Sequence, residues 1–437
     1  MEADRQMKKS DDHVAIDILH EHDLVTSIKE KMETISLLHS VCRVPEEFVE
    51  ENQENYFPNL LSIGPLHHGK DDFKVMEDQK WQYFNTLLNR NPNAETILDT
   101  CVKILRHSEQ KARKFYGKTV DMGSDNFVEI MLVDGCFIIE LFLEFSIKNL
   151  RRRDDPIFFS TSNKMFRLRC DMILLENQIP FWVLQQLFHI VVIPKQCNNM
   201  SLIQLALCFF RKLIPGDEQV PQDKFGPEIH HLLDLIRQNY LPTLPQPRSD
   251  GGQKHFRCAT HLQEAGITLR STAKEGPLNI KFIKGELQIP SLKIHGYTEI
   301  LFRNLIALEL CHRECSKTIT SYFIFMASLI RSKKDAQILY RKRILIDSGY
   351  EREGEFLNLM KKLQVEINVQ DFYYGEICRR VNEHQNSRRQ TWWQKAKHIY
   401  YKSELGVVGF VLAIILLVFL FTGIFFSAVS FLLHHFQ

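Results

Sequence analysis

An uncharged apolar run near the end of the chain constrains the whole protein most strongly. No Asp, Glu, Lys or Arg occurs from Gly406 to Leu433. About 28 residues at ~1.5 Å each give a helix of ~42 Å, longer than the ~30 Å hydrocarbon core of a bilayer. A soluble helix of this length carries a polar stripe, and Leu412 to Phe421 has none on any face. The run predicts a single transmembrane helix over residues 405–433.

The flanks of this helix predict its orientation. Only four residues follow it, so insertion after translation, in the manner of a tail anchor, is expected. Met1 to Asp23 is polar and lacks the apolar core of a secretory signal peptide. Basic residues beside a span stay cytosolic. Those before the helix are Arg379, Arg380, Arg388, Arg389, Lys395, Lys397 and Lys402, against Glu383 and Glu404. We therefore expect a single-pass membrane protein with a cytosolic body, in either the plasma membrane or an endomembrane.

A basic, aromatic segment over residues 386–404 precedes the predicted span. Its apolar and aromatic residues recur at helical spacing, with basic residues around them. Aromatic rings favour the headgroup region, and basic side chains are attracted to anionic lipids. The segment predicts an interfacial helix, and the alternative is an amphipathic helix packed on the body. The residues expected at the membrane interface are Arg388, Arg389, Trp392, Trp393, Lys395, Lys397, Tyr400 and Lys402.

Composition limits the function of the remaining residues. Hydrophobic residues make up 44% and charged residues 25% of the chain, which indicates a folded body. The net charge of +2 argues against nucleic-acid binding through bulk charge, because such domains usually carry a clustered basic excess. The ten cysteines contain no CxxC pair and indicate buried thiols in a reducing compartment.

Hydrophobic periodicity predicts a mainly α body. Helices are expected over Asp23 to Leu38 and Met76 to Leu88, in one capped by the Asn93 side chain, and in one opened by Ser124 or Asp125. A further helix over Phe166 to Phe188 should break near Gln178, because Pro180 removes a helical hydrogen bond. Later helices are expected over Thr298 to Cys315 and Ile319 to Ile330.

One strand pattern interrupts the helices. Leu278, Ile280 and Phe282 alternate with polar residues, Lys284-Gly285 can turn, and the alternation resumes at Leu287. This predicts one small β-hairpin, with Ile267 to Arg270 as a possible third strand. Leu241 to Gln253 is polar and proline-bearing and predicts an exposed loop. The expected organisation is an N-terminal arm over 1–34, a helical body over 35–385, the juxtamembrane segment over 386–404 and the transmembrane helix over 405–433.

Common catalytic and metal motifs fail on inspection. Gly117-Lys118-Thr119 ends like a phosphate-binding loop, but Ala112 stands where that loop needs a glycine. GxSxG, HExxH and GxGxxG are absent. His255, Cys258 and His261 have ligand-like spacing without an obvious fourth ligand. We predict no catalytic residue, no cofactor and no metal site.

Four carboxylates lie inside strongly apolar helical segments: Asp134, Glu140, Asp171 and Glu176. A charge buried there must pair or protonate. One hypothesis is a paired-carboxylate active site, since burial and like charges tune acids and bases. The favoured hypothesis is structural, with Asn177 and Gln178 binding loop backbone near Pro180. The expected cationic partners are Arg106, Arg113, Arg167 and Arg169.

The order of several segments resembles a known family. They are CRVPE from Cys42, SIGPLHHGK from Ser62, MEDQK from Met76, MLVDGCFIIELF from Met131, DMILLENQIPFWVL from Asp171, RCATHLQEAG from Arg257, LNIKFIKGELQIPSL from Leu278 and FRNLIALELC from Phe302. Together they resemble the plant domain-of-unknown-function 247 family, also called uncharacterised protein family 0481. The resemblance runs from about Ile35 to the terminal span and implies one C-terminal transmembrane helix. Relatives usually carry an acidic residue at the position of His261, so the apparent metal cluster is not expected to be a family site.

The resemblance implies no established enzymatic activity or cofactor. Some grass relatives are associated with self-recognition between pollen and stigma, which implies a role in protein recognition. We therefore expect a membrane-anchored recognition or scaffold protein with an unknown protein partner. The alternatives are a membrane-tethered enzyme that uses the four carboxylates, and a cell-surface receptor or ligand. For the last, Asn199-Met200-Ser201 supplies a glycosylation acceptor pattern.

Overall fold

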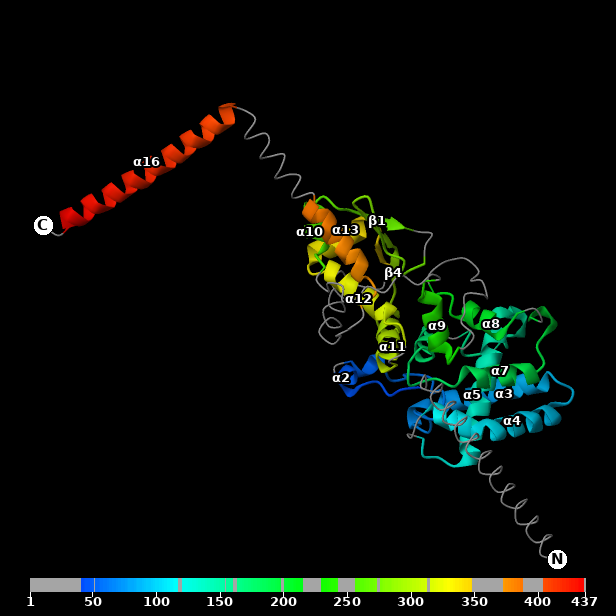
Figure 1. Cartoon of the computed structure of the whole chain (residues 1–437). Helices are drawn as coiled ribbons and strands as arrows, with labels where there is room; N and C mark the ends of the chain where they lie inside the picture. The colour runs from blue at the N-terminus through cyan, green and yellow to red at the C-terminus, as the bar shows by residue number, and fades with distance from the viewer. Residues whose placement is uncertain are drawn as a thin grey trace, which may run out of the picture.

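Helix α5, Ser124–Ser146, is the element around which the N-terminal half of the body packs. Its buried side chains lie on every face, because the sequence from Phe127 to Leu143 leaves almost no polar stripe. Helices α3, α4, α7 and α8 all pack against it. Figure 1 shows α5 enclosed by these neighbours. The helical fold predicted for this segment is confirmed, and the helix begins at Ser124 with Gly123 as its N-cap residue.

The chain is seen here in a computed structural model. The residues that it describes are 41–50, 52–116, 120–153, 155–159, 163–197, 200–214, 229–242, 256–272, 276–312, 315–347, 372–387 and 404–435. The predictions for Asp23 to Leu38, for nearly all of Leu241 to Gln253, and for Lys118, Asn199 and His255 lie outside these residues. So do all eight residues expected at the membrane interface.

The N-terminal half is helical throughout its described part. Its longer helices are α3 (Lys74–Asn89), α4 (Ala94–Phe115), α5, α6 (Lys164–Asp171), α7 (Phe181–Ile190), α8 (Leu202–Phe209) and α9 (Leu232–Tyr240). Its short turns of helix are α2 (Glu46–Val49), η2 (Gln53–Asn55), η3 (Asp71–Phe73), η5 (Lys148–Leu150) and η6 (Lys195–Cys197).

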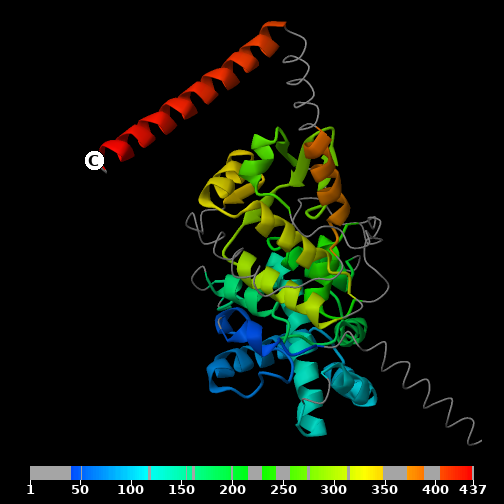
Figure 2. The same cartoon turned by 60° about the vertical axis from the view of Figure 1, so that its left-hand side comes forward.

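The C-terminal half adds strands to further helices. Its helices are α10 (Ala259–Glu264), α11 (Thr298–Cys311), α12 (Thr318–Leu329), α13 (Lys333–Arg341) and a helix over 375–387. Its strands are β1 (Thr268–Thr272), β2 (Lys281–Ile283), β3 (Glu286–Pro290), β4 (Leu292–Ile294) and β5 (Leu345–Asp347). Figures 1 and 2 show the strands at the end of the body opposite α3 and α4, with α11 reaching toward the N-terminal half.

The predicted hairpin is confirmed, and the strand content is larger than predicted. β2 and β3 pair antiparallel, and the turn between them holds Lys284 and Gly285 at φ of 50° and 82°. β1 joins β3 in parallel, with Thr268 opposite Glu286. A second sheet of β4 and β5 was missed. Each of those strands has three residues and lies outside the alternating run that predicted the hairpin, and only the tertiary fold pairs them.

Two local helix predictions need correction. Asn93 is the N-cap residue of α4, but its side chain makes no capping hydrogen bond. The break before Pro180 begins earlier than predicted, because α6 ends at Asp171 and α7 begins only at Phe181. Pro180 occupies the N-cap position, where its missing N–H costs nothing. The other later helices end at Cys311 and Leu329, close to their predicted limits.

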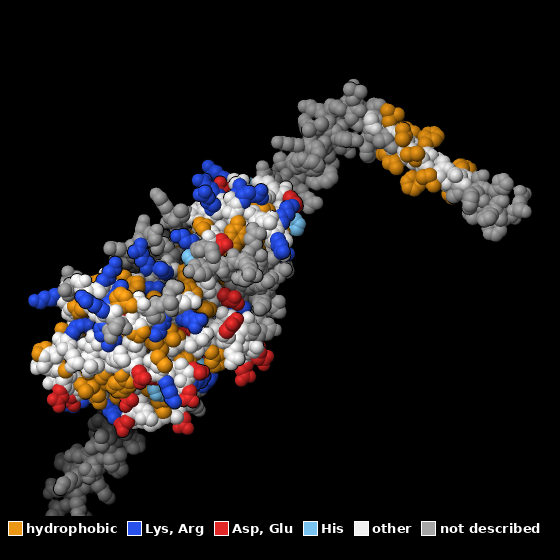
Figure 3. All heavy atoms as spheres, turned by 180° about the vertical axis from the view of Figure 1, so that it is seen from behind, with side chains coloured by type: hydrophobic (Ala, Val, Ile, Leu, Met, Phe, Trp, Pro, Cys, Tyr) orange, Lys and Arg blue, Asp and Glu red, His pale blue; other side chains and the backbone are white. Residues whose placement is uncertain are grey.

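Helix α16, Glu404–His435, contains 32 residues. Its described side chains include a continuous stretch from Ile414 to Ser427. Apolar side chains of that stretch are exposed, as the space-filling view in Figure 3 shows. Within the described ranges no helix has both the length and the hydrophobicity of a membrane span.

We predict that Gly64→Ala destabilises the body by about 2–4 kcal/mol. Gly64 has a φ of +72°, and an added Cβ would lie 2.8 Å from the Gln178 carbonyl oxygen, a backbone atom that cannot swing aside. Gly69 is the matched control, since its φ is +83° but no atom lies within 4 Å of an added Cβ. Gly69→Ala should show only the backbone strain, about 1 kcal/mol. Urea unfolding compares the two, and equal losses would contradict the close approach.

Candidate functional site: a network of buried charges

Asp171, the last residue of α6, holds a distant loop through its carboxylate. The backbone N–H groups of Asn59, Leu60 and Leu61 all donate to it, at 3.0, 2.7 and 2.8 Å. Burial raises the pKa of Asp171 to about 6, and the three hydrogen bonds act in the opposite direction. The carboxylate therefore satisfies three backbone donors that would otherwise be buried without an acceptor.

Asn177 and Gln178 extend this anchoring across the irregular segment between α6 and α7. Asn177 accepts from the N–H of Ile63 at 2.7 Å and donates to the carbonyl of Leu61 at 2.8 Å. Gln178 donates to the carbonyls of Met172 and Leu174, at 2.9 and 2.8 Å. The predicted role of these two amides in satisfying loop backbone is confirmed.

Asp134 lies midway along α5 and meets Lys80 of α3. The Lys80 ammonium is 2.6 Å from the Asp134 carboxylate, and the side chains are 0% and 2% exposed. The N–H of Gly64 donates to the other oxygen of Asp134 at 2.7 Å. Burial raises the pKa of Asp134 while Lys80 lowers it, so one buried charge compensates the other. The pair fixes α3, α5 and the 59–64 loop together.

Glu176 likewise holds backbone, at the start of the described chain. It accepts from the N–H of Val44 at 2.7 Å and lies 3.8 Å from the Arg43 guanidinium. His67 lies 4.0 Å away, but burial lowers the pKa of His67 to about 4, so this imidazole is neutral near pH 7. Burial raises the pKa of Glu176 itself.

Glu140 and Glu144 form a pair of carboxyls on one face of α5. Glu140 pairs with Arg90, and both Glu140 and Glu144 are 0% exposed. No N–H or O–H donor among the described residues reaches Glu144, whose carboxyl meets that of Glu140. Two carboxylates this close repel each other, so one of them favours its protonated form. Burial, reinforced by Glu140, raises the pKa of Glu144 to about 8, so Glu144 holds that proton at neutral pH.

Asp155 adds a third acid beside this pair. The Tyr83 hydroxyl donates to it at 2.7 Å, and so does the N–H of Ile157. Arg152 lies 3.7 Å from the same carboxylate. Burial raises the pKa of Tyr83 well above its usual range, so this hydroxyl remains a donor.

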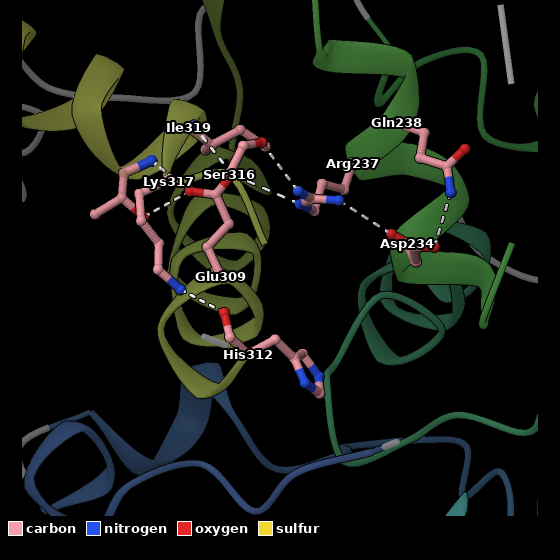
Figure 4. Close-up of polar contacts among 9 residues, drawn as sticks. Asp234, Arg237, Gln238, Glu309, His312, Ser316, Lys317 and Ile319 are labelled. Carbon is pink, nitrogen blue, oxygen red and sulfur yellow. Dashed lines mark hydrogen bonds and ion pairs between the residues drawn. The ribbon is translucent and has the colours of Figure 1, made fainter. Parts of the chain in front are cut away.

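A separate cluster joins the two halves of the body, as Figure 4 shows. Arg237 of α9 lies 3.4 Å from Asp234 and 3.6 Å from Glu309 of α11. Glu309 accepts from the N–H groups of Ile319 and Thr320, at 3.1 and 2.8 Å. Glu309 therefore caps α12 at its N-terminal end and balances Arg237 at the same time.

Of the four arginines expected as partners of the predicted carboxylates, three contact other groups. Arg106 binds Ser124 and Asp125, Arg113 binds Glu109, and Arg169 donates to the Phe209 carbonyl. Arg167 only influences Asp171 through its charge. The carboxylates instead take the cations and backbone donors that tertiary packing brings beside them.

The four predicted carboxylates do not converge on one site. In the described part of the chain no two of them share a donor or a cation. Sequence reasoning missed Lys80, Arg90, Glu144, Asp155 and the pair of Arg237 with Glu309. Glu309 carried the same signal as Asp134, a charged residue flanked by apolar residues within a helix, and that signal could have found it.

The spacing of His255, Cys258 and His261 resembles that of metal ligands, and the structure describes two of these residues. Cys258 Sγ lies 3.3 Å from Nδ1 of His261. Within the described ranges no group of three His, Cys, Asp or Glu side chains is arranged to hold a metal ion. His255 lies outside those ranges.

A mainly helical body, with buried charges that tie loops and helices together, is the class of protein that this geometry defines. The chain belongs to the family described as plant protein of unknown function, DUF247, whose model matches residues 41–419. It is 28% identical to the Arabidopsis thaliana UPF0481 protein At3g47200 over 390 residues, which cover 83% of this chain and 80% of the relative. It is 21% identical to the putative UPF0481 protein At3g02645 from the same plant, over an alignment of 497 positions covering 91% and 90%. No solved structure matches significantly.

We predict that Asp171→Asn lowers the free energy of unfolding by about 2–4 kcal/mol, because an amide cannot accept from three converging N–H groups. Asp125→Asn is the matched control, since that carboxylate is 89% exposed and pairs with a surface arginine. It should leave stability nearly unchanged. Denaturant unfolding of both variants measures the difference. If Asp171→Asn is as stable as the parent protein, the carboxylate of Asp171 does not have the structural role described above.

We predict that stability falls as pH rises from 7 to 8, by on the order of 1 kcal/mol per pH unit from Glu144 alone. Native Glu144 keeps its proton up to about pH 8, whereas an unfolded glutamate has lost it above its ordinary value of 4.5. Glu144→Gln should remove that slope, and the exposed Glu129→Gln on the same helix should retain it. Urea unfolding at several pH values gives the slopes, and an unchanged slope in Glu144→Gln would contradict the buried proton.

Proposed function

We propose that this chain is a membrane-anchored recognition or scaffold protein, whose helical body binds another protein and whose α16 crosses a bilayer. The exposure of the apolar side chains of α16 is the observation that supports a membrane anchor. Its described apolar side chains from Leu412 to Phe426 are between 45% and 72% exposed, whereas those of the body form one buried core. Water would not favour a bare apolar helix, and lipid would.

The chemistry of α16 also suits a bilayer. The sequence holds no charged residue from Gly406 to Leu433. The hydroxyl of Thr422 donates to the carbonyls of Val418 and Phe419, both at 3.0 Å. A hydroxyl satisfied within its own helix adds little cost in hydrocarbon.

The buried charges support recognition over catalysis. Asp134, Asp171 and Glu176 each accept from backbone N–H groups of distant segments. Glu140 and Glu144 are fully enclosed, so a substrate cannot touch them without opening the core. The membrane-tethered enzyme would need an acid or base that reaches a ligand, and these carboxyls are occupied in holding the fold.

Two of the basic residues counted before the predicted span form contacts within the body, so fewer of them can set the proposed cytosolic orientation. Arg379 pairs with Glu376 and Glu383, and Arg380 donates to the Phe282 carbonyl, so both serve the helix over 375–387. The basic residues from Arg388 to Lys402 remain as the determinants of orientation. We propose that the chain is divided as the sequence predicts, with the body ending near residue 385 and a lipid-contacting segment over 386–404. Self-recognition of the kind implied by the grass relatives is one form that binding to a protein partner can take.

We predict that the protein stays with membranes after alkaline carbonate extraction, and that Leu416→Asp with Leu420→Asp releases it. Each aspartate at the centre of a spanning helix costs about 3 kcal/mol of insertion. The control pair is Val75→Asp with Val192→Asp, which adds the same charge at exposed apolar positions of the body. The control pair should remain in the membrane pellet. Full release of the unsubstituted protein would contradict the anchor.

We predict that protease digests the body of the full chain in sealed vesicles without detergent, and that Asn199 carries no glycan. Protection of the body together with a glycan would place it on the lumenal side and favour the cell-surface receptor or ligand. Resistance to carbonate and sensitivity to protease are separate readouts, so the anchor and its orientation are tested independently.

A further inference from the structure

The first described residues of the chain, 41–44, form a strap across three elements that are far apart in sequence. The N–H of Val41 donates to the carbonyl of Phe115 at the end of α4, at 3.0 Å. The N–H of Val44 binds Glu176 at 2.7 Å. Between them, the thiol of Cys311 donates to the carbonyl of Arg43 at 3.8 Å. Every one of these contacts is non-covalent.

Two thiols meet where the strap reaches the end of α11. Cys42 lies on the strap and Cys311 is the last residue of α11. Each thiol contacts the residue beside the other, because Cys311 Sγ lies 3.8 Å from the Arg43 carbonyl oxygen and Cys42 Sγ lies 3.7 Å from Nε2 of His312. Both are partly exposed, whereas six other cysteines are buried. The buried six are Cys101, Cys136, Cys170, Cys197, Cys258 and Cys378. The pair is therefore within reach both of each other and of a small reagent in solution.

An imidazole stands beside the pair. Cys42 Sγ lies 3.7 Å from Nε2 and 3.9 Å from Nδ1 of His312. His312 is 3% exposed, and its backbone carbonyl accepts from the Lys317 ammonium at 2.6 Å. A thiolate is the reactive form of cysteine, and a neighbouring imidazole can take the thiol proton. The neighbouring Cys42 thiol and burial raise the pKa of Cys311, and the imidazole that can take a thiol proton lies against Cys42.

We propose that Cys42 and Cys311 form a reversible disulfide that fastens the 41–44 strap to the end of α11. The link would join residues 269 positions apart and close most of the body into one covalent loop. The inference rests on the placement of the two thiols and does not depend on the proposed anchor.

The chemistry is a thiol–disulfide exchange with a low-molecular-weight disulfide such as oxidised glutathione. The Cys42 thiolate attacks one sulfur of the reagent, forms a mixed disulfide and expels one thiolate, which takes up the proton lost by Cys42. Cys311 then loses its proton, attacks the Cys42 sulfur and expels the second thiolate, which is protonated in turn. Two protein thiols are oxidised to one disulfide, and one reagent disulfide is reduced to two thiols.

The test uses the full chain in detergent, first reduced and then incubated with oxidised glutathione at pH 7. Remaining thiols are blocked, and non-reduced peptides are identified by mass spectrometry. We expect a linked peptide joining residues 42 and 311, which reverts on addition of dithiothreitol. Cys315→Ser is the matched control, because Cys315 is also partly exposed and lies four residues from Cys311; it should retain the link. Glutathione left on Cys42 without a link, or a link between Cys311 and Cys315, would overturn the proposal.

Two further readouts test the role of the link and of the imidazole. Oxidation should raise the thermal unfolding midpoint of the unsubstituted protein and of Cys315→Ser, but not that of Cys42→Ser. An unchanged midpoint in linked protein would show that the disulfide does not fasten the strap. His312→Gln should slow link formation about tenfold at pH 7, with the rate recovering at pH 9, where thiols ionise unaided. A loss of rate that persists at pH 9 would limit His312 to a structural role.

Discussion

The carboxylate of Asp171 and the three backbone N–H groups of residues 59–61 make the interaction on which the N-terminal half depends. A loop buried against helices must place its polar backbone groups somewhere, and here a side chain at the end of α6 accepts them. Asn177 then holds the next residues of the same loop, and Asp134 holds Gly64. A single irregular segment is thus fixed by three side chains from two different helical regions. Losing any one leaves a buried donor without an acceptor, and that cost exceeds the value of the bond itself.

The same device recurs where the two halves of the body meet. Glu309 caps α12 and also balances Arg237 from α9, so a charge that would be costly alone serves two neighbours. Glu176 does likewise for the strap at residues 41–44. The Glu140 and Glu144 pair is the exception, because it is balanced by one cation and one retained proton. That arrangement makes the pair sensitive to a rise in pH.

These positions bear directly on function. The carboxylates that the sequence suggests as catalytic candidates bind backbone donors and cations of the fold. Among the described residues, no three histidine, cysteine, aspartate or glutamate side chains are arranged to hold a metal ion. What lies toward solvent is a helical surface, a pair of thiols at the strap and the apolar α16. The proposed anchor and binding role rest on these surfaces, because binding to membranes and to proteins uses exposed groups of this kind.

The sequence by itself determined the elements whose cause is local. The all-apolar pattern of 127–143 required a buried helix, Pro180 required a break, and Lys284-Gly285 between alternating residues required a hairpin turn. It also predicted that Asp134, Glu140, Asp171 and Glu176 need compensation, because desolvation penalises any charge in an apolar helix. Only the tertiary structure decided what compensates them. Lys80, Arg90 and the N–H groups of residues 44 and 59–64 lie tens of residues away, and no periodicity encodes which distant donor meets which carboxylate. The three-residue strands β4 and β5 were decided in the same way, because each pairs with a segment about fifty residues away that no local pattern identifies.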